Sequence, residues 1–117
     1  MNFNDLTPYI NKIDLIKDTA NQLIKDFDMF GVEIKFSGNT YNAYEELFDQ
    51  VEPHIQKMIS SNQSKFMGIL YRIDVSDEQI KKAVNENLSE PFSVIITDLI
   101  MKRELQKVVI RKHYKAQ

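Results

Sequence analysis

Apolar residues recur at helical spacing through most of this chain. The clearest stripe alternates intervals of three and four residues and consists of Ile13, Ile16, Ala20, Leu23, Phe27 and Phe30. This spacing places the side chains on one face of a helix, which we expect over residues 8–30. Thr7 and Pro8 are typical of a helix N-cap and first helical position. Gly31 is expected to end the helix in the left-handed conformation.

The next residues change to an alternating pattern. Apolar and polar side chains alternate over residues 32–36, and Ser37, Gly38 and Asn39 form a turn signal. No clear partner strand follows. We therefore expect a short extended segment, or one arm of a small hairpin, near residues 32–39.

A second helix is predicted from Asn42 to about residue 60. Asn42 followed by Glu45 resembles a capping box, with asparagine in place of serine or threonine. Pro53 lies inside the apolar periodicity and is expected to kink or restart the helix, because it lacks the N–H and its ring crowds the preceding turn. Residues 60–62, two serines and an asparagine, should end the helix.

Residues 65–75 fit two patterns. Alternate positions are apolar, as in a strand, but Phe66, Ile69, Leu70 and Ile73 also fit one helical face. We favour a helix, because only a helix places Leu70 on the apolar side. After this segment, residues 76–79 form a capping box for a short helix that carries Ile80, Ala83, Val84 and, at its end, Leu88. Residues 89–91 then open a last helix running to about residue 114.

The predicted fold is therefore mainly α, a compact array of about five helices in one domain over residues 1–117. A hydrophobic content of 43% with 27% charged residues is sufficient for a packed core. The absence of cysteine excludes disulfides, zinc–thiolate sites, iron–sulfur clusters and a cysteine nucleophile. We find neither a signal peptide nor an apolar run of about 20 residues, so we expect a cytoplasmic protein with no membrane span.

The last predicted helix is apolar on two nearly opposite sides. One side carries Phe92, Ile95, Ile96, Leu99, Ile110 and Tyr114, and the other carries Val94, Met101, Leu105, Val108 and Val109. A helix with two apolar sides is normally buried between two layers. The second layer is either other helices of the same chain or a second copy of it.

The same helix carries a basic ridge, defined here as Arg103, Lys107, Arg111 and Lys115. Residues 1–101 have a net charge of −7, whereas residues 102–117 have a net charge of +5. Such a ridge suits a phosphate backbone, an anionic membrane surface or an acidic protein surface. It also suits a structural role, since cations offset the dipole at a helix C-terminus and can pair with the acidic second helix.

Candidate catalytic and metal-binding residues are few. Neither His54 nor His113 has a histidine or carboxylate three or four residues away, so neither starts a helical metal site. Four carboxylates gather between Glu45 and Glu52, and close carboxylates can serve as an acid–base pair or hold a divalent cation. Negative charge in the first turns of a helix is also explained by the helix dipole. We assign no catalytic residue, metal or cofactor.

The leading hypothesis is a non-catalytic interaction or assembly domain that acts through its C-terminal helix. Its apolar contact with a second subunit or protein partner would use Met101, Leu105 and Val108. Its orientation would be set by Arg103, Lys107 and Arg111. A nucleic-acid-associated protein using the basic ridge is the alternative, and a small enzyme or metal binder using the Glu45–Glu52 carboxylates is third.

Overall fold

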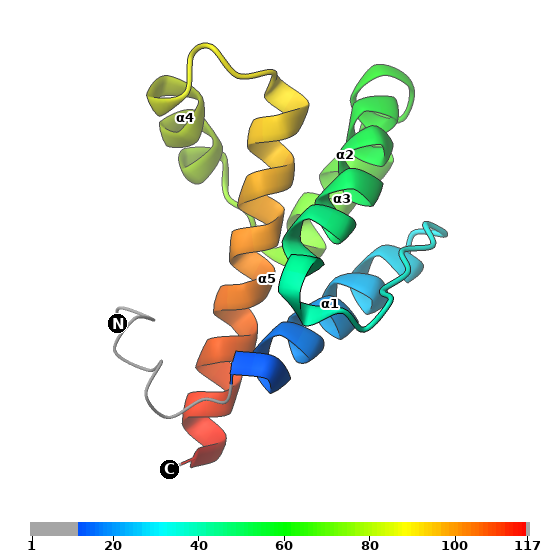
Figure 1. The fold of residues 1–117 in the computed structure, drawn as a ribbon. Helices are drawn as coiled ribbons and strands as arrows, with labels where there is room; N and C mark the ends of the chain where they lie inside the picture. The colour runs from blue at the N-terminus through cyan, green and yellow to red at the C-terminus, as the bar shows by residue number, and fades with distance from the viewer. Residues whose placement is uncertain (1–11, 117) are drawn as a thin grey trace.

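Residues 12–116 are described by a computed structural model, and within them the chain is helical (Figure 1). The elements are α1 (Lys12–Asp28), a 3-10 turn η2 (Thr40–Asn42), α2 (Ala43–Ser61), α3 (Gln63–Ile73), α4 (Asp77–Glu86) and α5 (Phe92–Ala116). This part of the chain contains no β-strand. The prediction of a mainly α array of about five helices is confirmed. The predicted cap at Thr7 and Pro8 lies outside the described residues.

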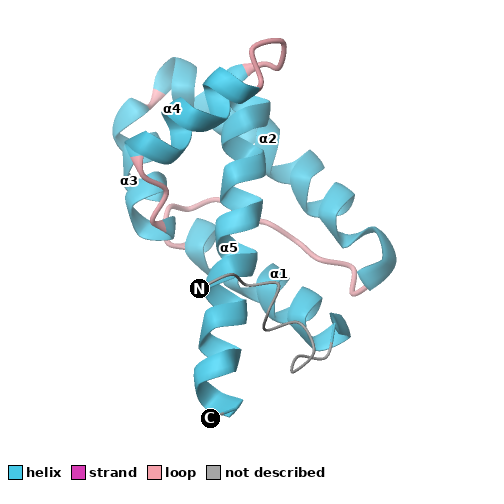
Figure 2. Cartoon of the chain, turned by 90° about the vertical axis from the view of Figure 1, so that its left-hand side faces the viewer, coloured by secondary structure: helices cyan, strands magenta, loops and turns pink. Residues whose placement is uncertain are grey.

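Helix α5 is the centre of the fold. It contacts α1, α2, α3 and α4, which surround it on several sides (Figures 1 and 2). Both of its apolar sides are used inside the chain, because Ile96 and Ile100 on one part of its surface and Val108 and Val109 on another are all buried. Much of the second apolar side is therefore covered by helices of the same chain.

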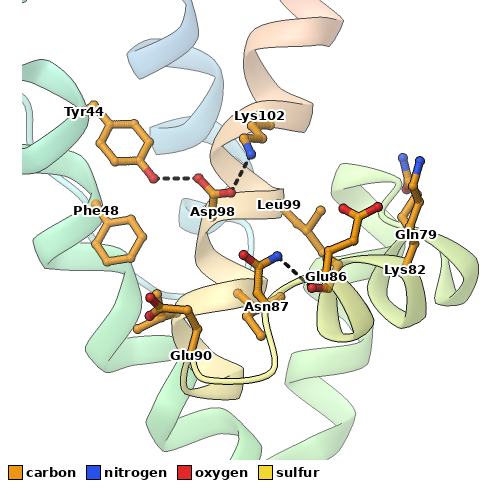
Figure 3. A pocket seen from close by; sticks show the side chains of 13 residues that line it. Tyr44, Phe48, Gln79, Lys82, Glu86, Asn87, Glu90, Asp98, Leu99 and Lys102 are labelled. Carbon is orange, nitrogen blue, oxygen red and sulfur yellow. Dashed lines mark hydrogen bonds and ion pairs between the residues drawn. The ribbon is translucent and has the colours of Figure 1, made fainter.

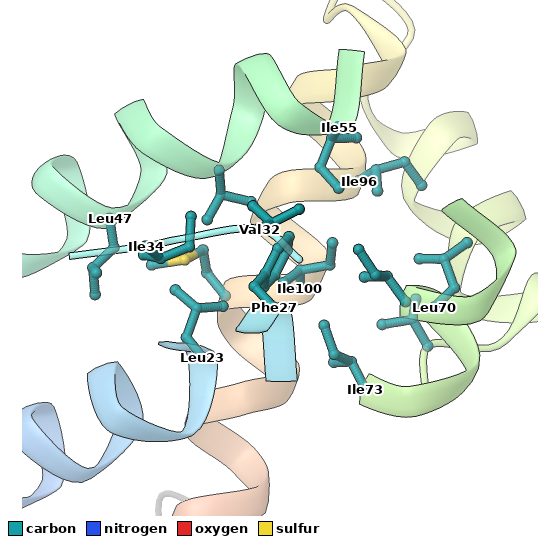
Figure 4. Close-up of a cluster of buried hydrophobic side chains, with 14 of the residues drawn as sticks. Leu23, Phe27, Val32, Ile34, Leu47, Ile55, Leu70, Ile73, Ile96 and Ile100 are labelled. Carbon is teal, nitrogen blue, oxygen red and sulfur yellow. The ribbon is translucent and has the colours of Figure 1, made fainter. Parts of the chain in front are cut away.

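Helix α1 buries the central part of its predicted stripe. Leu23 and Phe27 are 1% and 0% exposed and meet α5 residues in the core (Figure 4). Ile13, at the start of the helix, is 54% exposed and does not contribute to this core. Gly31 has a φ of +74°, and the Val32 N–H donates to the Phe27 carbonyl at 3.1 Å. This is the helix end predicted for Gly31.

The segment after α1 is extended but forms no hairpin in the described chain. Its Val32 and Ile34 side chains are buried in the core. Its backbone is held by Gln50 of α2, whose amide accepts from the Lys35 N–H at 2.8 Å and donates to the Lys35 carbonyl at 2.6 Å. A side chain thus supplies the two hydrogen bonds that a neighbouring strand would supply.

The start of α2 differs from the prediction. The Asn42 side chain makes no capping hydrogen bond, so the capping box predicted for Asn42 and Glu45 is wrong. The turn η2 precedes α2 directly, and Asn39 caps that turn by accepting from the Tyr41 N–H at 3.0 Å. Helix α2 also continues unbroken past Pro53 and ends at Ser61, so the proline does not restart the helix.

The ambiguous segment over residues 65–75 forms helix α3 up to Ile73, which confirms the helical prediction. The helix buries Phe66, Ile69, Leu70 and Ile73, the face expected from the helical pattern. It ends at Asp74, whose φ of 71° is left-handed. The Asp74 N–H donates to the carbonyl of Leu70 at 2.9 Å.

Helix α4 has the predicted capping box. The Ser76 side chain accepts from the Gln79 N–H, and the Gln79 side chain accepts from the Ser76 N–H. No residue of α4 is fully buried, and Leu88 lies beyond the helix with 82% of its surface exposed. Helix α4 is therefore attached to the surface of α5. No described helix is long and apolar enough to cross a bilayer.

Candidate functional site

The three apolar residues predicted to form an interface lie in different environments. Met101 and Val108 are 6% and 0% exposed, inside the chain's own core, whereas Leu105 is partly exposed. A partner can reach Leu105 with the helices packed as they are. It cannot reach Val108 unless the helices separate, and it can reach Met101 only through the small exposed part that lines a hollow beside Leu105. Leu105 is therefore the apolar candidate that remains available at the surface.

The basic residues predicted to orient a partner are paired within the chain. Arg103 Nη2 lies 2.9 Å from Asp74 Oδ2, at the end of α3. Lys107 Nζ lies 3.1 Å from Asp26 Oδ2 on α1 and 2.8 Å from Glu104 Oε1. These cations connect α5 to α1 and α3 and leave little unpaired charge at these positions.

Two further cations of α5 also bind side chains of α1. Arg111 Nη1 donates to Gln22 Oε1 at 3.0 Å, and Lys112 pairs with Asp18 on α1. The ion pairs of this helix with other helices thus run to α1 and to the end of α3. From the sequence we considered the acidic second helix as the pairing partner, but none of these ion pairs reaches α2.

The carboxylates between Glu45 and Glu52 do not act as one group. Glu46 accepts from the Ser37 N–H and the Ser37 hydroxyl, both at 2.7 Å. Glu45 and Asp49 are exposed, and one oxygen of Glu52 is buried without a hydrogen-bond partner. Within residues 12–116, no three histidine, aspartate or glutamate side chains gather closely enough to hold a metal ion.

The two histidines are also separated in the fold. His54 lines a hollow of about 340 Å³ beside Lys57 and Lys65, at the junction of α2 and α3. The His113 ring packs edge-on against Tyr114, with ring centroids 5.7 Å apart. Neither lies beside the groove described next.

A groove of about 520 Å³ runs along α5 (Figure 3). Helix α5 forms its floor, and α2 and α4 form its two walls. The floor is lined by Val94, Ile95, Asp98, Leu99 and Lys102. The walls are lined by Tyr44 and Phe48 of α2, by Gln79, Lys82, Ala83 and Glu86 of α4, and by Asn87 and Glu90 of the following loop. We call this surface the α5 groove.

A hydrogen-bond network fixes one wall of the α5 groove to its floor. The Tyr44 hydroxyl donates to Asp98 Oδ1 at 2.7 Å, and Lys102 Nζ lies 2.7 Å from Asp98 Oδ2. Burial and the Asp98 carboxylate raise the pKa of the Tyr44 hydroxyl, which therefore remains a donor. The Tyr44 ring stacks on Phe48 with centroids 5.6 Å apart. The Tyr44 side chain is thus held by Asp98 at its hydroxyl and by Phe48 at its ring.

Two further hollows share Lys102 with the α5 groove as a lining residue. One, of about 330 Å³, is lined mainly by α5 residues, including Leu99 and Leu105, together with Gln79 of α4 and Val75. The other, of about 310 Å³, is lined by Met101 and Leu105 of α5, by Tyr44, and by further residues of α1, η2 and α2. Lys102 lines all three, and Leu105 lines both smaller ones. The accessible face of α5 is therefore hollowed from Val94 to Leu105.

Sequence reasoning identified only part of this site. The two-sided apolar pattern placed Val94 and Leu105 on the second side of the last helix, and both are partly exposed. It gave no indication that Tyr44, Asp98 and Lys102 meet, because Tyr44 and Asp98 are 54 residues apart.

Comparisons of this chain with known protein-family models, curated protein sequences and solved structures find no match. The functional argument therefore depends on the geometry of the site.

Proposed function

We propose that this domain is a non-catalytic protein-interaction module whose binding surface is the accessible face of α5. The observation that supports the proposal is a set of three neighbouring hollows along α5 that share Lys102 as a lining residue. Partly exposed Val94, Leu99 and Leu105 provide apolar contact area along this face. Grooves between helices commonly bind the apolar face of an amphipathic helix.

The dimensions of the face suit a short helical segment of a partner protein. Residues 94–105 of α5 span about 16 Å at a rise of 1.5 Å per residue. A partner helix of about three turns covers this length and presents apolar residues at intervals of three and four. The stacked Tyr44 and Phe48 rings offer a rigid apolar wall, a common feature of interaction hot spots.

The charges at one end of the α5 groove define the partner further. Asp98 is already paired with Lys102, whereas Glu86 and Glu90 form no ion pair within the described chain. Lys82 also lines this wall, so the two glutamates leave an excess of one negative charge there. We expect a basic side chain near the end of the partner segment that meets Glu86 and Glu90, where charge mainly improves specificity and encounter rate.

The two other hypotheses gain less from the structure. A nucleic-acid surface needs unpaired cations, but Arg103, Lys107 and Lys112 are paired with acidic groups of the same chain. An acid–base site needs carboxylates that converge, but Glu46 is bound by Ser37 while Glu45 is exposed. The interaction hypothesis is therefore the one we carry forward.

Selection from a display library of amphipathic helical peptides tests the proposal. Peptides that bind the wild-type protein should shift the NMR signals of Val94, Leu99 and Leu105. Leu105→Glu should weaken their binding at least tenfold, because a carboxylate enters an apolar contact. Met67→Glu is the matched control, because Met67 is 54% exposed on α3 and lines none of these hollows.

Two results would overturn the proposal. The first is selected peptides that bind Leu105→Glu as tightly as the wild type, which would place their site elsewhere. The second is a stable wild-type dimer, seen by light scattering, that Leu105→Glu splits into monomers. That result would assign the same face to a second copy of the chain in place of a partner helix.

A further inference from the structure

Two carboxyl groups are buried together where α1 packs against α5. Asp26 of α1 and Glu104 of α5 are 1% and 0% exposed. One lysine of α5 bridges them, with Lys107 Nζ 3.1 Å from Asp26 Oδ2 and 2.8 Å from Glu104 Oε1. This cluster lines no hollow of the surface just described and is independent of the proposed function.

The two carboxyl groups are not equally well supplied with donors. Asp26 Oδ1 accepts from Gln22 Nε2 at 3.0 Å and from Arg72 Nε at 3.1 Å, in addition to the contact with Lys107. Glu104 is in contact with Lys107 alone, neither of its oxygens accepts a hydrogen bond in the described chain, and it faces Asp26. Two carboxyl groups form a hydrogen bond with one another only when one of them carries a proton. The proton belongs on Glu104, because Asp26 already accepts several hydrogen bonds.

We propose that this cluster is a proton-controlled lock between α1 and α5. Protonated Glu104 donates to Asp26 and keeps the two helices packed. Loss of the proton places two negative charges beside one another in a buried contact that holds only one lysine. The repulsion between the two carboxylates loosens the packing of α1 on α5. Helix α1 has its main contact with α5, and α2, α3 and α4 each contact α5 independently. The loosening is therefore local to α1.

The electrostatics of the cluster agree with this geometry. Burial and the adjacent Asp26 carboxylate raise the pKa of Glu104 to about 8, and Lys107 opposes this only in part. Burial alone would also raise the pKa of Asp26, but hydrogen bonds from Glu104, Gln22 and Lys107 hold it below its usual value. The charges acting on Glu104 come from α1 and α5; Arg72 of α3 acts through Asp26, and α2 and α4 contribute none.

The sign of the pH effect follows from proton linkage. Between about pH 4.5 and 8, folded Glu104 holds a proton that the unfolded chain has released. The stabilising contribution of the raised pKa is therefore complete below about pH 4.5 and is lost as the pH rises to about 8. The lowered pKa of Asp26 acts in the opposite sense, and its contribution is lost only in acid.

The test combines side-chain NMR with amide hydrogen exchange on the full chain between pH 6 and 9. The Glu104 carboxyl carbon should titrate near pH 8. Protection of amides over residues 22–28 should fall at least tenfold relative to α2 across this range, after correction for intrinsic exchange. Glu104→Gln keeps a neutral donor at the same place and should remove this dependence on pH. Glu45→Gln, a change at an exposed carboxylate of α2, should preserve it.

A titration midpoint near 4.5 in the wild type would overturn the lock, since Glu104 would then be ionised at neutral pH. So would protection in α1 that follows α2 at every pH. Because the midpoint is measured on the wild type, the test stays decisive even if Glu104→Gln folds poorly.

Discussion

Gln50 performs the role of a neighbouring strand for the extended segment that follows α1. Its side-chain amide both accepts from and donates to the backbone of Lys35. This arrangement explains how the buried Val32 and Ile34 remain extended without a sheet. The sequence predicted the extended segment from its alternation of apolar and polar residues. It could not predict Gln50, because a glutamine on a helix carries no signal for a partner 15 residues away.

Replacing Gln50 with leucine should reduce the free energy of unfolding by about 1–3 kcal/mol. The physical reason is the loss of two hydrogen bonds to a backbone segment whose side chains are buried. Gln56→Leu provides the control, because Gln56 is exposed on the same helix and should change stability by less than about 0.5 kcal/mol. Urea unfolding of both variants measures the difference, and equal effects would contradict the role given to Gln50.

At the scale of whole elements, apolar periodicity predicted helices more accurately than it predicted their ends. The buried face of α3 was predicted residue by residue, since Phe66, Ile69, Leu70 and Ile73 can all be buried only in a helix. The capping box predicted at Asn42 was wrong, because η2 leads directly into α2 and Asn39 caps that turn. Local sequence indicates residues able to cap, but the preceding backbone decides which one does.

Helix α4 should be the least stable helix of the described fold. None of its residues is fully buried, and it depends on its capping box and on contacts with α5. Ser76→Ala removes the cap and should cost about 1 kcal/mol, raising amide exchange in α4 about fivefold with little change in α2. Ser64→Ala is the control, because Ser64 lies in the first turn of α3 but is not its cap. Exchange that rises equally in all helices would refute this local effect.

Across the whole molecule, the charge asymmetry of the sequence becomes a set of contacts between helices. The basic C-terminal segment pairs with Asp18 and Asp26 of α1 and with Asp74 at the end of α3. The sequence predicted both the basic ridge and a possible pairing within the chain. It could not identify the acidic partners, because that depends on how α1 and α3 pack around α5.

The same limit applies to the candidate site. Two apolar sides on the last helix predicted two layers around it, and the structure buries part of each side, Ile95 and Ile96 on one and Met101, Val108 and Val109 on the other. The part left accessible is set by where α2 and α4 lie on either side of α5 (Figure 3). No local pattern contains that information. The packing of the neighbouring helices buries Val108 and leaves Leu105 partly exposed, although the sequence placed both residues on the same side of the helix.

Comparing the urea unfolding of Leu105→Glu with that of Val108→Glu tests most directly whether the second apolar side of α5 is divided into core at Val108 and binding surface at Leu105. The account predicts that Val108→Glu loses several kcal/mol or fails to fold, because a carboxylate is buried without a partner. Leu105→Glu should stay within about 1 kcal/mol of the wild type, because Leu105 is partly exposed beside two hollows. If Leu105→Glu unfolds as readily as Val108→Glu, the face belongs to the core, and the proposed binding surface is contradicted.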